Sequence, residues 1–391
     1  MRPSRLRLSP AARRILVLVH RWFGVALGFN LAALCLTGAV LLYEEDIDAR
    51  LNPALMSPLA QGTPIGIGDA LAVYRAAHPN VAIDRIYSPN GPVGSYRLRV
   101  GPKDAQLEAF VDPYRAVLLG DRIREDGLLR KLELFHTTLL WPKIGRWVNG
   151  FVAFGALWMV TAGLLLWWPT AKGQLKARLS VKRKASAQRR NLDLHNVIGV
   201  YSLPVLVLIL LTGATWAFDD FTEPLARRTG TAPVTEPPKA KRPSGGSLLN
   251  TEELLQISAL EAPGSHVVKY MLPTLKNRIV EVHREWSDGE RFGNRANVWI
   301  DAENGKVVAV NSSRRDKGYE SAWRWIRPLH EGLWGAGLSR LVYALVGLAP
   351  VCLIITGLTA FFFRKRARKK LSTKRRLSPA EQIDEDVLPA A

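Results

Sequence analysis

Four uninterrupted apolar blocks constrain this chain more than any other feature of its sequence. They cover residues 22–43, 147–171, 196–218 and 341–363, and none of them contains Lys, Arg, Asp or Glu. At about 1.5 Å per residue, each block is long enough to cross a hydrocarbon core of about 30 Å as a helix. Only a helix satisfies the backbone hydrogen bonds of such a segment in lipid. The sequence therefore predicts an α-helical membrane protein with four transmembrane helices.

The first block also has to be distinguished from a cleaved signal peptide. Its apolar stretch is too long for one, and no small-x-small cleavage site with a polar continuation follows Tyr43. We therefore expect this block to be retained as a transmembrane helix.

The distribution of positive charge predicts how the helices are oriented. The chain holds 54 Lys and Arg against 34 Asp and Glu, a formal net charge of +20. The excess lies mainly in residues 1–21, 171–194 and 364–391. The positive-inside rule places these three segments in the cytoplasm, where they meet anionic membrane lipids. We expect a multi-pass membrane protein with both termini in the cytoplasm and two long, nearly neutral segments on the outer side of the membrane. No nucleic-acid partner is expected, because no recognition motif accompanies the basic runs.

The cysteine content excludes several classes of cofactor site. Cys35 and Cys352 are the only two cysteines, and both lie inside apolar blocks. A disulfide framework, a cysteine-rich zinc site and a thiolate-bound iron–sulfur cluster are therefore excluded. Covalently attached haem is excluded as well, because there is no C-x-x-C-H motif.

The same spacing of residues recurs in the two halves of the chain. His20, Gly24 and Thr37-Gly38 are matched, at identical intervals, by His195, Gly199 and Thr212-Gly213; His136, Arg146 and Gly163 are matched by His330, Arg340 and Gly357. We interpret the chain as an internal duplication whose halves are related by an axis along the membrane normal. The Thr-Gly pairs, which include Thr356-Gly357, are expected to be close-packing sites where the Thr hydroxyl bonds to the backbone, although their small residues could also leave room for a macrocycle.

Each half carries a long outside segment with the pattern of a small α+β domain. In the first, residues 69–78 are expected to be helical, and residues 83–88, 95–100, 108–112 and 116–119 to form strands. In the second, residues 251–260 are expected to be helical, and residues 267–272, 278–284, 296–300 and 306–310 to form strands, with Asn304-Gly305 as a hairpin turn. Residues 229–247, rich in Pro and Gly, are a predicted linker.

These predictions divide the chain into eight parts. They are the cytoplasmic N-terminus with the first transmembrane helix (1–44), the first periplasmic domain with its amphipathic His segment (45–145), the second transmembrane helix (146–170), a basic cytoplasmic loop (171–194), the third transmembrane helix (195–218), the linker with the second periplasmic domain and its His segment (219–340), the fourth transmembrane helix (341–363) and a basic cytoplasmic tail (364–391).

Four of the seven histidines occupy repeat-related positions at the membrane boundaries. His20 and His195 lie at the predicted cytoplasmic ends of the first and third helices, whereas His136 and His330 precede the second and fourth helices on the outside. Two His pairs, one near each membrane face, are the layout needed to bind two b-type haems through paired imidazoles. Two alternatives remain: another metal, or purely structural histidines that the duplication copied.

Other polar residues carry weaker expectations. Arg146 and Arg340 could meet haem propionates, as could Arg13, Arg14, Arg21, Arg324 and Arg327. His78, His266 and His283 are expected to be solvated or locally bonded, although His283, on a predicted strand, could face a substrate. The acidic residues after the first and third helices, Glu44, Glu45, Asp46, Asp219 and Asp220, are expected to mark exposed helix ends. We find no acid–base triad or nucleophile, so no catalytic residue is assigned.

The chain resembles the PepSY-associated transmembrane family, whose members are described as iron-regulated membrane proteins. The resemblance rests on residues 19–24 (VHRWFG) with Leu36-Thr37-Gly38, residues 194–199 (LHNVIG) with Leu211-Thr212-Gly213, and residues 329–332 (LHEG). Val111-Asp112-Pro113 and Trp299-Ile300-Asp301 with Gly305-Lys306 are similar to the PepSY pattern. The resemblance covers about residues 10–365, and within the family it is greatest to ferric-siderophore reductases of the ferrioxamine type.

This resemblance implies a fold, cofactors and an activity. It implies two PepSY-like periplasmic domains and two b-type haems, with His20, His136, His195 and His330 as ligands of the haem iron. It also implies an oxidoreductase that passes electrons across the inner membrane to a ferric siderophore, with the hydroxamate type favoured, and releases ferrous iron. No Gly-rich dinucleotide fingerprint is present, so a cytoplasmic partner or quinol is expected as the electron donor. The alternatives are a non-redox PepSY protein that binds a peptide, protease or siderophore, and a quinol-linked cytochrome b with another acceptor.

Overall fold

The structure is a computed structural model that describes residues 8–91, 94–102, 106–169, 174–228, 247–274, 277–287, 294–315 and 319–377. Most of the predicted linker 229–247 and the end of the predicted tail, residues 378–391, lie outside these ranges. The chain divides into two compact units, one formed by residues 1–39, 148–214 and 341–391, the other by residues 40–147 and 215–340. Each unit therefore combines segments from both halves of the chain.

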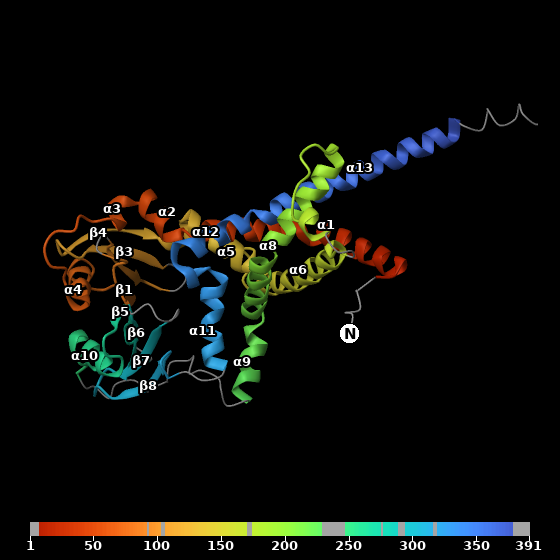
Figure 1. Ribbon diagram of the computed structural model, residues 1–391. Helices are drawn as coiled ribbons and strands as arrows, with labels where there is room; N and C mark the ends of the chain where they lie inside the picture. The colour runs from red at the N-terminus through yellow and green to blue at the C-terminus, as the bar shows by residue number, and fades with distance from the viewer. Residues whose placement is uncertain are drawn as a thin grey trace, which may run out of the picture. The chain divides into compact units, whose positions relative to one another are not determined.

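The first unit contains the long apolar helices (Figure 1). They are α1 (Pro10–Leu41), α6 (Gly145–Trp167), α8 (Ala187–Ala217) and the pair α12 (Ala336–Gly347) and α13 (Ala349–Leu377), with the short α7 (Gln174–Arg178) in the connection that follows α6. Four stretches are long and apolar enough to span a membrane: Pro10–Leu41, Gly145–Trp167, Ala187–Ala217 and Gly337–Ala367. The prediction of four membrane helices is therefore confirmed.

The fourth stretch is divided between α12 and α13, with Leu348 between them. Pro350 follows closely, and because proline has no amide hydrogen it cannot donate the usual hydrogen bond to Val346. The Leu348 amide instead donates to the Leu345 carbonyl at 3.2 Å, as in a tighter turn. The break thus has a local cause in the sequence.

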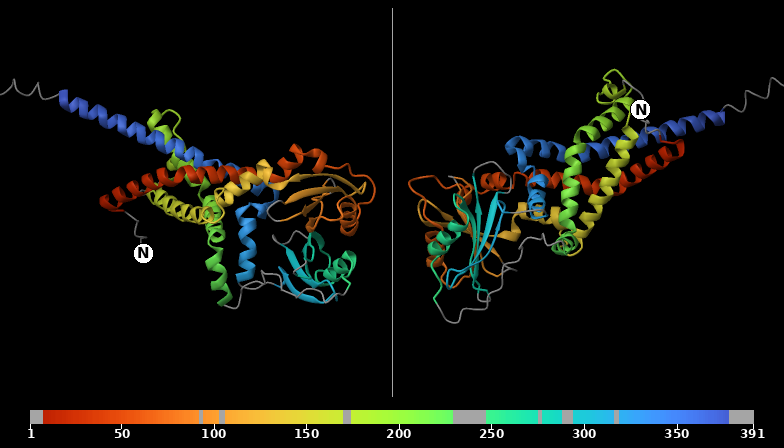
Figure 2. Two further views of the ribbon diagram at one scale, coloured as in Figure 1. Left: turned by 180° about the vertical axis from the view of Figure 1, so that it is seen from behind. Right: turned by 60° about the horizontal axis from the view of Figure 1, so that its bottom comes forward.

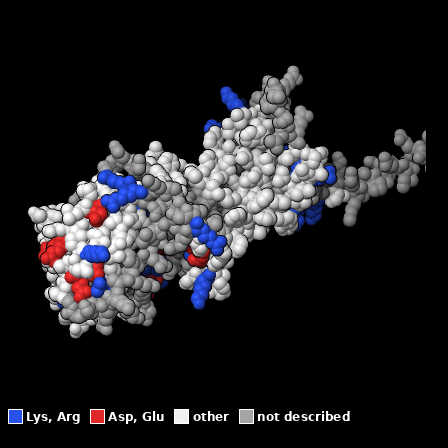
Figure 3. All heavy atoms as spheres, turned by 90° about the horizontal axis from the view of Figure 1, so that it is seen from below, with Lys and Arg blue, Asp and Glu red and all other residues white. Residues whose placement is uncertain are grey.

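Small side chains form the contacts among these helices. Ala153 and Ala156 on α6 are buried together with Leu31 and Cys35 of α1 and Leu206 of α8. By contrast, large apolar residues such as Trp22, Phe151 and Ile355 remain exposed, and the visible surface of this unit is almost free of charged side chains (Figure 3). Small residues inside and large apolar residues outside are what lipid-exposed helices require.

The predicted Thr-to-backbone hydrogen bonds are confirmed. The hydroxyl groups of Thr37, Thr212 and Thr356 donate to the carbonyls of Ala33, Leu208 and Cys352 at 2.8, 2.6 and 2.7 Å. Each hydroxyl is thus satisfied within its own helix, four residues back, and its oxygen can still accept a hydrogen bond.

The second unit is built around one eight-stranded antiparallel sheet (Figures 1 and 2). The first half supplies α4 (Ile67–Ala77), β1 (Ile83–Tyr87), β2 (Tyr96–Val100), β3 (Leu107–Asp112), β4 (Val117–Ile123) and α5 (Leu128–Thr138). The second half supplies α10 (Thr251–Glu261), β5 (His266–Met271), β6 (Ile279–Glu285), β7 (Arg295–Asp301), β8 (Val307–Ser312) and α11 (Tyr319–His330). Every strand and helix expected for these segments is therefore present, in the same order in both halves.

The second unit also contains short helices and turns. They are α2 (Glu44–Leu51) and α3 (Pro53–Met56) after α1, α9 (Asp219–Arg228) after α8, and single 3₁₀ turns at Arg124–Asp126 and Leu333–Gly335. An Asn250 cap, which accepts from the Glu253 amide at 2.8 Å, starts α10.

The two expected α+β domains differ from the observed fold in one respect: their strands form a single sheet. The strand order is β4-β3-β2-β1-β5-β6-β7-β8, and β1 pairs with β5 in the register Arg85↔Met271, Ile86↔Tyr270, Tyr87↔Lys269. Each four-stranded meander alone would leave β1 or β5 as an edge with unpaired backbone groups. Pairing the two edges satisfies those groups and joins the halves.

The two faces of the sheet are different in character. Helices α4 and α10 cover one face, where Leu71, Tyr74 and Leu254 pack against Ile86, Tyr270 and other buried strand residues. Because side chains alternate along a strand, the neighbours of these core residues point to the opposite face. That face, called the polar face below, carries Arg85, Tyr87, Arg97, Arg99, Lys269, Glu281 and His283.

Candidate functional site

Two histidine pairs, one in each unit, are the candidate functional site. In the helical unit, His20 of α1 and His195 of α8 lie with ring centroids 6.2 Å apart and ring planes at 89°. In the sheet unit, His136 of α5 and His330 of α11 also lie 6.2 Å apart, at 61°. The tertiary structure therefore brings together the residues that the repeat spacing paired.

The two imidazoles of the first pair are each held through Nδ1. His20 Nδ1 lies 2.9 Å from the Met159 carbonyl oxygen on α6, and His195 Nδ1 lies 2.8 Å from Thr356 Oγ1 on α13. A carbonyl only accepts, so His20 must donate from Nδ1. The Thr356 hydroxyl already donates to Cys352, so it accepts from His195 as well. In both rings the network thus leaves Nε2 unprotonated, which is the form that binds a metal.

Glycines give these rings room. A Cβ atom at Gly163 of α6 would lie 2.9 Å from His20 Cε1, closer than van der Waals contact allows. A Cβ at Gly357 of α13 would lie 3.6 Å from His195 Cε1, an ordinary contact. The matched glycines of the repeat therefore lie against the matched histidines, and the one at position 163 is sterically required.

The second pair lies at the C-terminal ends of two helices. His136 is in the last turn of α5, and His330 is the last residue of α11. The Trp216 ring lies 5.1 Å from that of His330. After α5 the chain turns through Leu139 and Leu140, whose φ values of 51° and 61° are in the left-handed region and end the helix there.

The arginines predicted to meet a cofactor have acidic partners in the sheet unit. Arg146 pairs with Asp219 at 2.6 Å and also contacts Asp220. Arg340 donates to the Leu42 carbonyl at 2.5 Å and pairs with Asp46 at 3.0 Å. The acidic residues expected only to mark helix ends thus anchor the residues that follow α1 and α8.

Two of the predicted arginines nevertheless keep a buried donor. Nε of Arg21 and Nε of Arg340 are both buried, and neither has a hydrogen-bond partner among the described residues. Arg21 otherwise contacts the rings of Trp22 and Phe361, at 5.3 and 5.9 Å. A buried donor without an acceptor costs about 1–3 kcal/mol, so each of these two atoms is an unfavourable feature of the described structure.

The remaining predicted arginines and histidines have local roles. Arg324 donates to Asn311, and burial, followed by nearby Arg295, lowers its pKa to about 10. Arg327 pairs with Glu331 at 2.9 Å. His78 packs on Tyr74, His266 lies 3.3 Å from Ser287, and His283 contacts Glu281 on the polar face. Arg13 and Arg14 lie in the first turns of α1.

Sequence reasoning missed several residues that hold the first pair. The Met159 carbonyl is a backbone group, so its role as an acceptor cannot be predicted from the residue type. The sequence predicts that Thr356 packs between helices and that its hydroxyl bonds to the backbone, but it does not predict the hydrogen bond to His195. Asn191, one turn before His195, donates to the Thr356 carbonyl at 2.8 Å and joins α8 to α13 at the same place.

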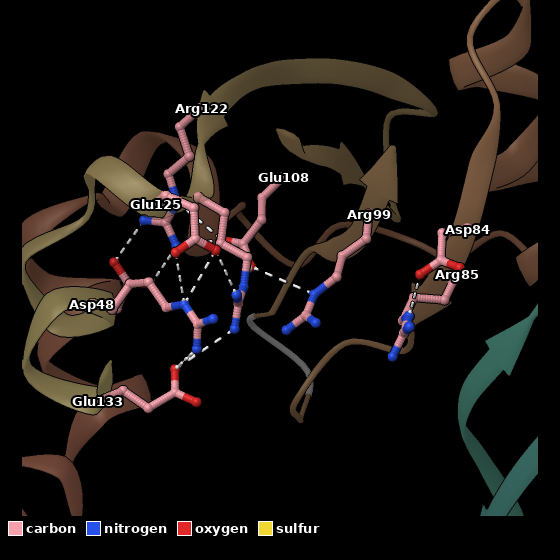
Figure 4. Close-up of polar contacts among 10 residues, drawn as sticks. Asp48, Asp84, Arg85, Arg99, Glu108, Arg122, Glu125 and Glu133 are labelled. Carbon is pink, nitrogen blue, oxygen red and sulfur yellow. Dashed lines mark hydrogen bonds and ion pairs between the residues drawn. The ribbon is translucent and has the colours of Figure 1, made fainter. Parts of the chain in front are cut away.

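An ion-pair network ties α5 to the polar face of the sheet (Figure 4). Glu108 of β3 and Asp48 of α2 both accept from Arg122, at 2.9 and 2.6 Å. Arg124 reaches Glu133 of α5 at 3.6 Å. Since Glu133 lies one turn before His136, this network fixes the helix that presents that histidine.

No group of three or more His, Cys, Asp or Glu side chains in the described ranges could hold a metal ion. Each histidine pair by itself brings two imidazole rings together.

Comparisons with known proteins show which family this chain belongs to. A family model described as the PepSY-associated TM region matches residues 17–365. No curated protein matches the sequence. One similar solved structure is that of a protein described as a lipoprotein from Clostridium difficile 630, at 10% identity and a TM-score of 0.27, over 66% of this chain and 98% of that chain. The family match covers most of the chain, and with its four membrane helices the protein belongs to the PepSY-associated transmembrane family.

Proposed function

We propose that this protein is a di-haem b-type cytochrome of the bacterial inner membrane, and that it reduces ferric siderophores on the periplasmic side and releases ferrous iron. The observation that carries the proposal is the geometry of the two histidine pairs, each with ring centroids 6.2 Å apart. The basic segments support the orientation, with both termini in the cytoplasm.

The spacing of the rings fits two imidazoles on one metal. A metal–imidazole bond is about 2.0 Å long, and two rings bound on opposite sides of an ion then have centroids roughly 6 Å apart. Among the described residues, neither pair is joined by a third His, Cys, Asp or Glu side chain in a group that could hold a metal ion. A metal that brings its own equatorial ligands suits such a site, and haem iron does so.

The chain's residues hold and tune each site. His20 and His195 would bind through Nε2, because Met159 and Thr356 accept from Nδ1 and fix the tautomer. Gly163 leaves space beside the His20 ring. The buried Nε groups of Arg21 and Arg340 suit propionate oxygens. When bound, haem supplies one-electron transfer without an open axial position, which favours electron transfer over oxygen chemistry.

The His20/His195 pair would hold one haem and the His136/His330 pair the other, and bound haem would supply the single electrons that reduce the substrate iron. Siderophore oxygens are hard anionic ligands that bind Fe(III) far better than Fe(II). Adding one electron therefore loosens the iron and leaves the siderophore intact. The electron donor would be quinol or a cytoplasmic partner.

A visible spectrum of the purified protein, with haem quantified per chain, tests the cytochrome. We expect a b-type spectrum with about two haems per chain. His20→Ala or His195→Ala should remove one haem, and His136→Ala or His330→Ala the other. His78→Ala and His266→Ala are the matched controls, since both residues lie outside the pairs and should leave the haem content unchanged.

The same samples separate the alternatives. A colourless protein after expression with added haem would exclude both cytochrome readings and favour a non-redox PepSY protein. Reoxidation of the reduced protein by ferric siderophores, followed in the visible spectrum, would support the reductase. A protein that holds two haems but is not reoxidised by any hydroxamate or catecholate complex would be a cytochrome with another acceptor.

A further inference from the structure

The centre of the polar face holds four cations on three neighbouring strands. Arg97 and Arg99 of β2, Arg85 of β1 and Lys269 of β5 surround Tyr87 of β1 in the register Arg85↔Arg99, Tyr87↔Arg97 and Tyr87↔Lys269. Arg85 and Arg99 are thus directly opposite each other, an arrangement of like charges that destabilises a sheet unless something compensates for it. All four side chains are half-buried.

The chain itself compensates for little of this charge. Arg85 pairs with Asp84 at 2.6 Å, and Arg99 has only Glu108, at 4.0 Å. Arg99 Nε is buried without a hydrogen-bond partner in the described ranges. Arg97 and Arg99 lie over the Tyr87 ring at 4.9 and 5.3 Å, which does not neutralise them. Within the described part of the chain, Arg97 and Lys269 have no ion-pair partner.

The cations elsewhere on this side of the sheet are paired differently. In Figure 4 the carboxylates of Asp48, Glu108, Glu125 and Glu133 meet the guanidinium groups of Arg122, Arg124 and Arg130 at distances from 2.6 to 3.7 Å. On the other side of the centre, the acid that influences Lys269 is Glu281, whose carboxylate contacts His283. Acids thus pair with the cations around the cluster and with Arg85, whereas Arg97 and Lys269 have no ion-pair partner among the described residues.

The electrostatics of Lys269 agree with this description. Burial lowers its pKa to about 8, and of the surrounding charges Glu281 raises it whereas Arg85, Arg99 and Arg295 lower it. An anion placed among these cations would reverse that effect and stabilise the charged ammonium group.

The polar face is also the side of the sheet that the histidine helices contact. Glu133, one turn before His136 on α5, pairs with Arg124, which in turn reaches Glu108 on the polar face. Arg324 of α11 donates to Asn311, whose neighbour across the strands, Asn297, points to the same face. Arg97 and Lys269 therefore share a face of the sheet with the helices that carry His136 and His330.

We propose that Arg97, Arg99 and Lys269 around Tyr87 form the substrate site, and that it takes an anionic ferric chelate of the catecholate or carboxylate class. This inference rests on the proposed function. It changes the expected substrate, because three singly charged hydroxamates neutralise Fe(III), whereas three doubly charged catecholates leave a trianion. Only the anionic class supplies the counter-charge that these cations lack.

The spacing of the cations favours a chelate over a small anion. Arg97 and Lys269 lie on either side of β1, and two strand spacings amount to about 10 Å. A chelate presents oxygens on several arms and can therefore contact Arg97, Arg99 and Lys269 together. The Tyr87 ring between them would lie against the aromatic or apolar part of such a ligand.

Binding can be measured apart from reduction by replacing the iron with gallium(III), which has a similar size and charge but does not accept an electron here. We would titrate the full-length protein in detergent with gallium tris-catecholate, gallium citrate and a neutral gallium tris-hydroxamate, using calorimetry. The catecholate complex should bind at least tenfold more tightly than the hydroxamate, and its affinity should fall as salt is added. Equal affinity for the neutral and anionic complexes would overturn the proposal.

Variants locate the site. Arg97→Gln and Lys269→Gln should each weaken catecholate binding about tenfold, a change of about 1.4 kcal/mol, while Arg97→Lys should retain most of it. Arg75→Gln is the matched control, because Arg75 is an exposed cation on α4, which covers the other face. Unchanged affinity in both Gln variants would place the ligand elsewhere. The haem spectrum shows whether each variant is folded.

Two further outcomes are informative. If inorganic phosphate binds more tightly than the chelates and displaces them, the cluster is a phosphate site and the proposal is wrong. A protein with an intact two-haem spectrum that binds no anionic chelate would contradict this inference alone. A protein without haem would instead contradict the proposed function.

Discussion

The imidazole rings of His20 and His195 are fixed by different acceptors, a backbone carbonyl in one case and a hydroxyl in the other. Both acceptors enforce the same tautomer, because each has no hydrogen left to donate to the ring. Residues that never touch a cofactor can therefore decide whether these histidines are able to bind one.

Thr356→Val tests this role of the hydroxyl at residue scale. Valine keeps the shape of Thr356 but leaves His195 Nδ1 without that acceptor, so we expect haem affinity at the first pair to fall by about 10–100-fold. Thr356→Ser should restore it. Thr359→Val is the control, since Thr359 is on the same helix and its hydroxyl donates only to the Ile355 carbonyl. Haem content and the electron paramagnetic resonance spectrum report the change, and an unaltered spectrum would contradict the assignment.

Glu44 is a second residue whose surroundings determine its chemistry. It lies in the first turn of α2, where the helix dipole favours a carboxylate. Burial and, next, the nearby carboxylate of Glu133 outweigh this effect and raise the pKa of Glu44 to about 7. The folded protein thus binds a proton that the unfolded chain releases near pH 4.5, the ordinary value for this group.

This shift predicts the pH dependence of stability. Because the pKa is higher in the folded state, the free energy of unfolding should decrease as the pH rises from about 4.5 to about 7 and then remain low. Glu44→Gln should remove this loss and stabilise the protein by about 1–3 kcal/mol at pH 8, with little effect at pH 4.5. Thermal unfolding of both proteins at the two pH values measures it. A variant no more stable than the original at pH 8 would refute the prediction.

At the scale of elements, the helices of the first unit approach one another through small residues, and two glycines of the repeat are not equivalent. A side chain at Gly163 would overlap the His20 ring, whereas the space at Gly357 accepts a methyl group. Both glycines are in helix interiors, where alanine is intrinsically favoured by about 0.5–1 kcal/mol. Steric overlap therefore makes alanine destabilising at position 163, whereas helix propensity makes it neutral or stabilising at position 357.

Gly163→Ala should consequently destabilise the protein by about 1–3 kcal/mol and displace the His20 ring. Gly357→Ala, at the matched position, should be neutral or slightly stabilising. Thermal unfolding in detergent compares the two, and haem content shows whether the ring has moved. Equal effects of both substitutions would mean that the helices separate easily at Gly163.

The sheet shows at the same scale why two repeat-related segments need not form two domains. The residues of β1 and β5 have ordinary strand patterns, and neither pattern predicts that the two strands pair with each other. Their pairing places Tyr87 between Arg97 and Lys269 and so assembles the cation cluster from both halves of the chain.

At the scale of the whole molecule, the net charge of +20 describes topology more than binding. Most of the excess lies in three segments that the positive-inside rule places on one side of the membrane. The sheet unit carries cations and anions close together on its visible surface (Figure 3). Local imbalance at the polar face, and not overall charge, is therefore what distinguishes the proposed ligand site.

Cysteine accessibility tests the predicted orientation. In a Cys35→Ala, Cys352→Ala background, a membrane-impermeant maleimide should label Lys306→Cys in spheroplasts, because Lys306 is exposed in the turn between β7 and β8. Lys184→Cys, exposed in the basic loop before α8, should be labelled only after the membrane is permeabilised. Labelling in the opposite order would invert the topology.

The sequence by itself determined the elements that depend on local pattern. Uncharged apolar runs required four membrane helices, alternation of side chains indicated all eight strands, and the repeat spacing paired His20 with His195 and His136 with His330. These features follow from the lipid environment and from side-chain periodicity. Both depend on residues that are close together in the sequence, so a local pattern is enough to predict them.

Which distant groups meet depends on the three-dimensional fold. The fold joins β1 to β5 and places the Met159 carbonyl and the Thr356 hydroxyl on the imidazoles. Among the described residues, it gives Arg97 and Lys269 no ion-pair partner. A backbone carbonyl is the same in every residue, so the sequence does not show which one will accept a hydrogen bond. Unpaired sheet edges and charges can be recognised only when the positions of all neighbouring residues are known. Packing gives most polar and charged groups a partner and leaves a few without one. Which groups these are depends on residues far apart in the sequence, so no single segment predicts it.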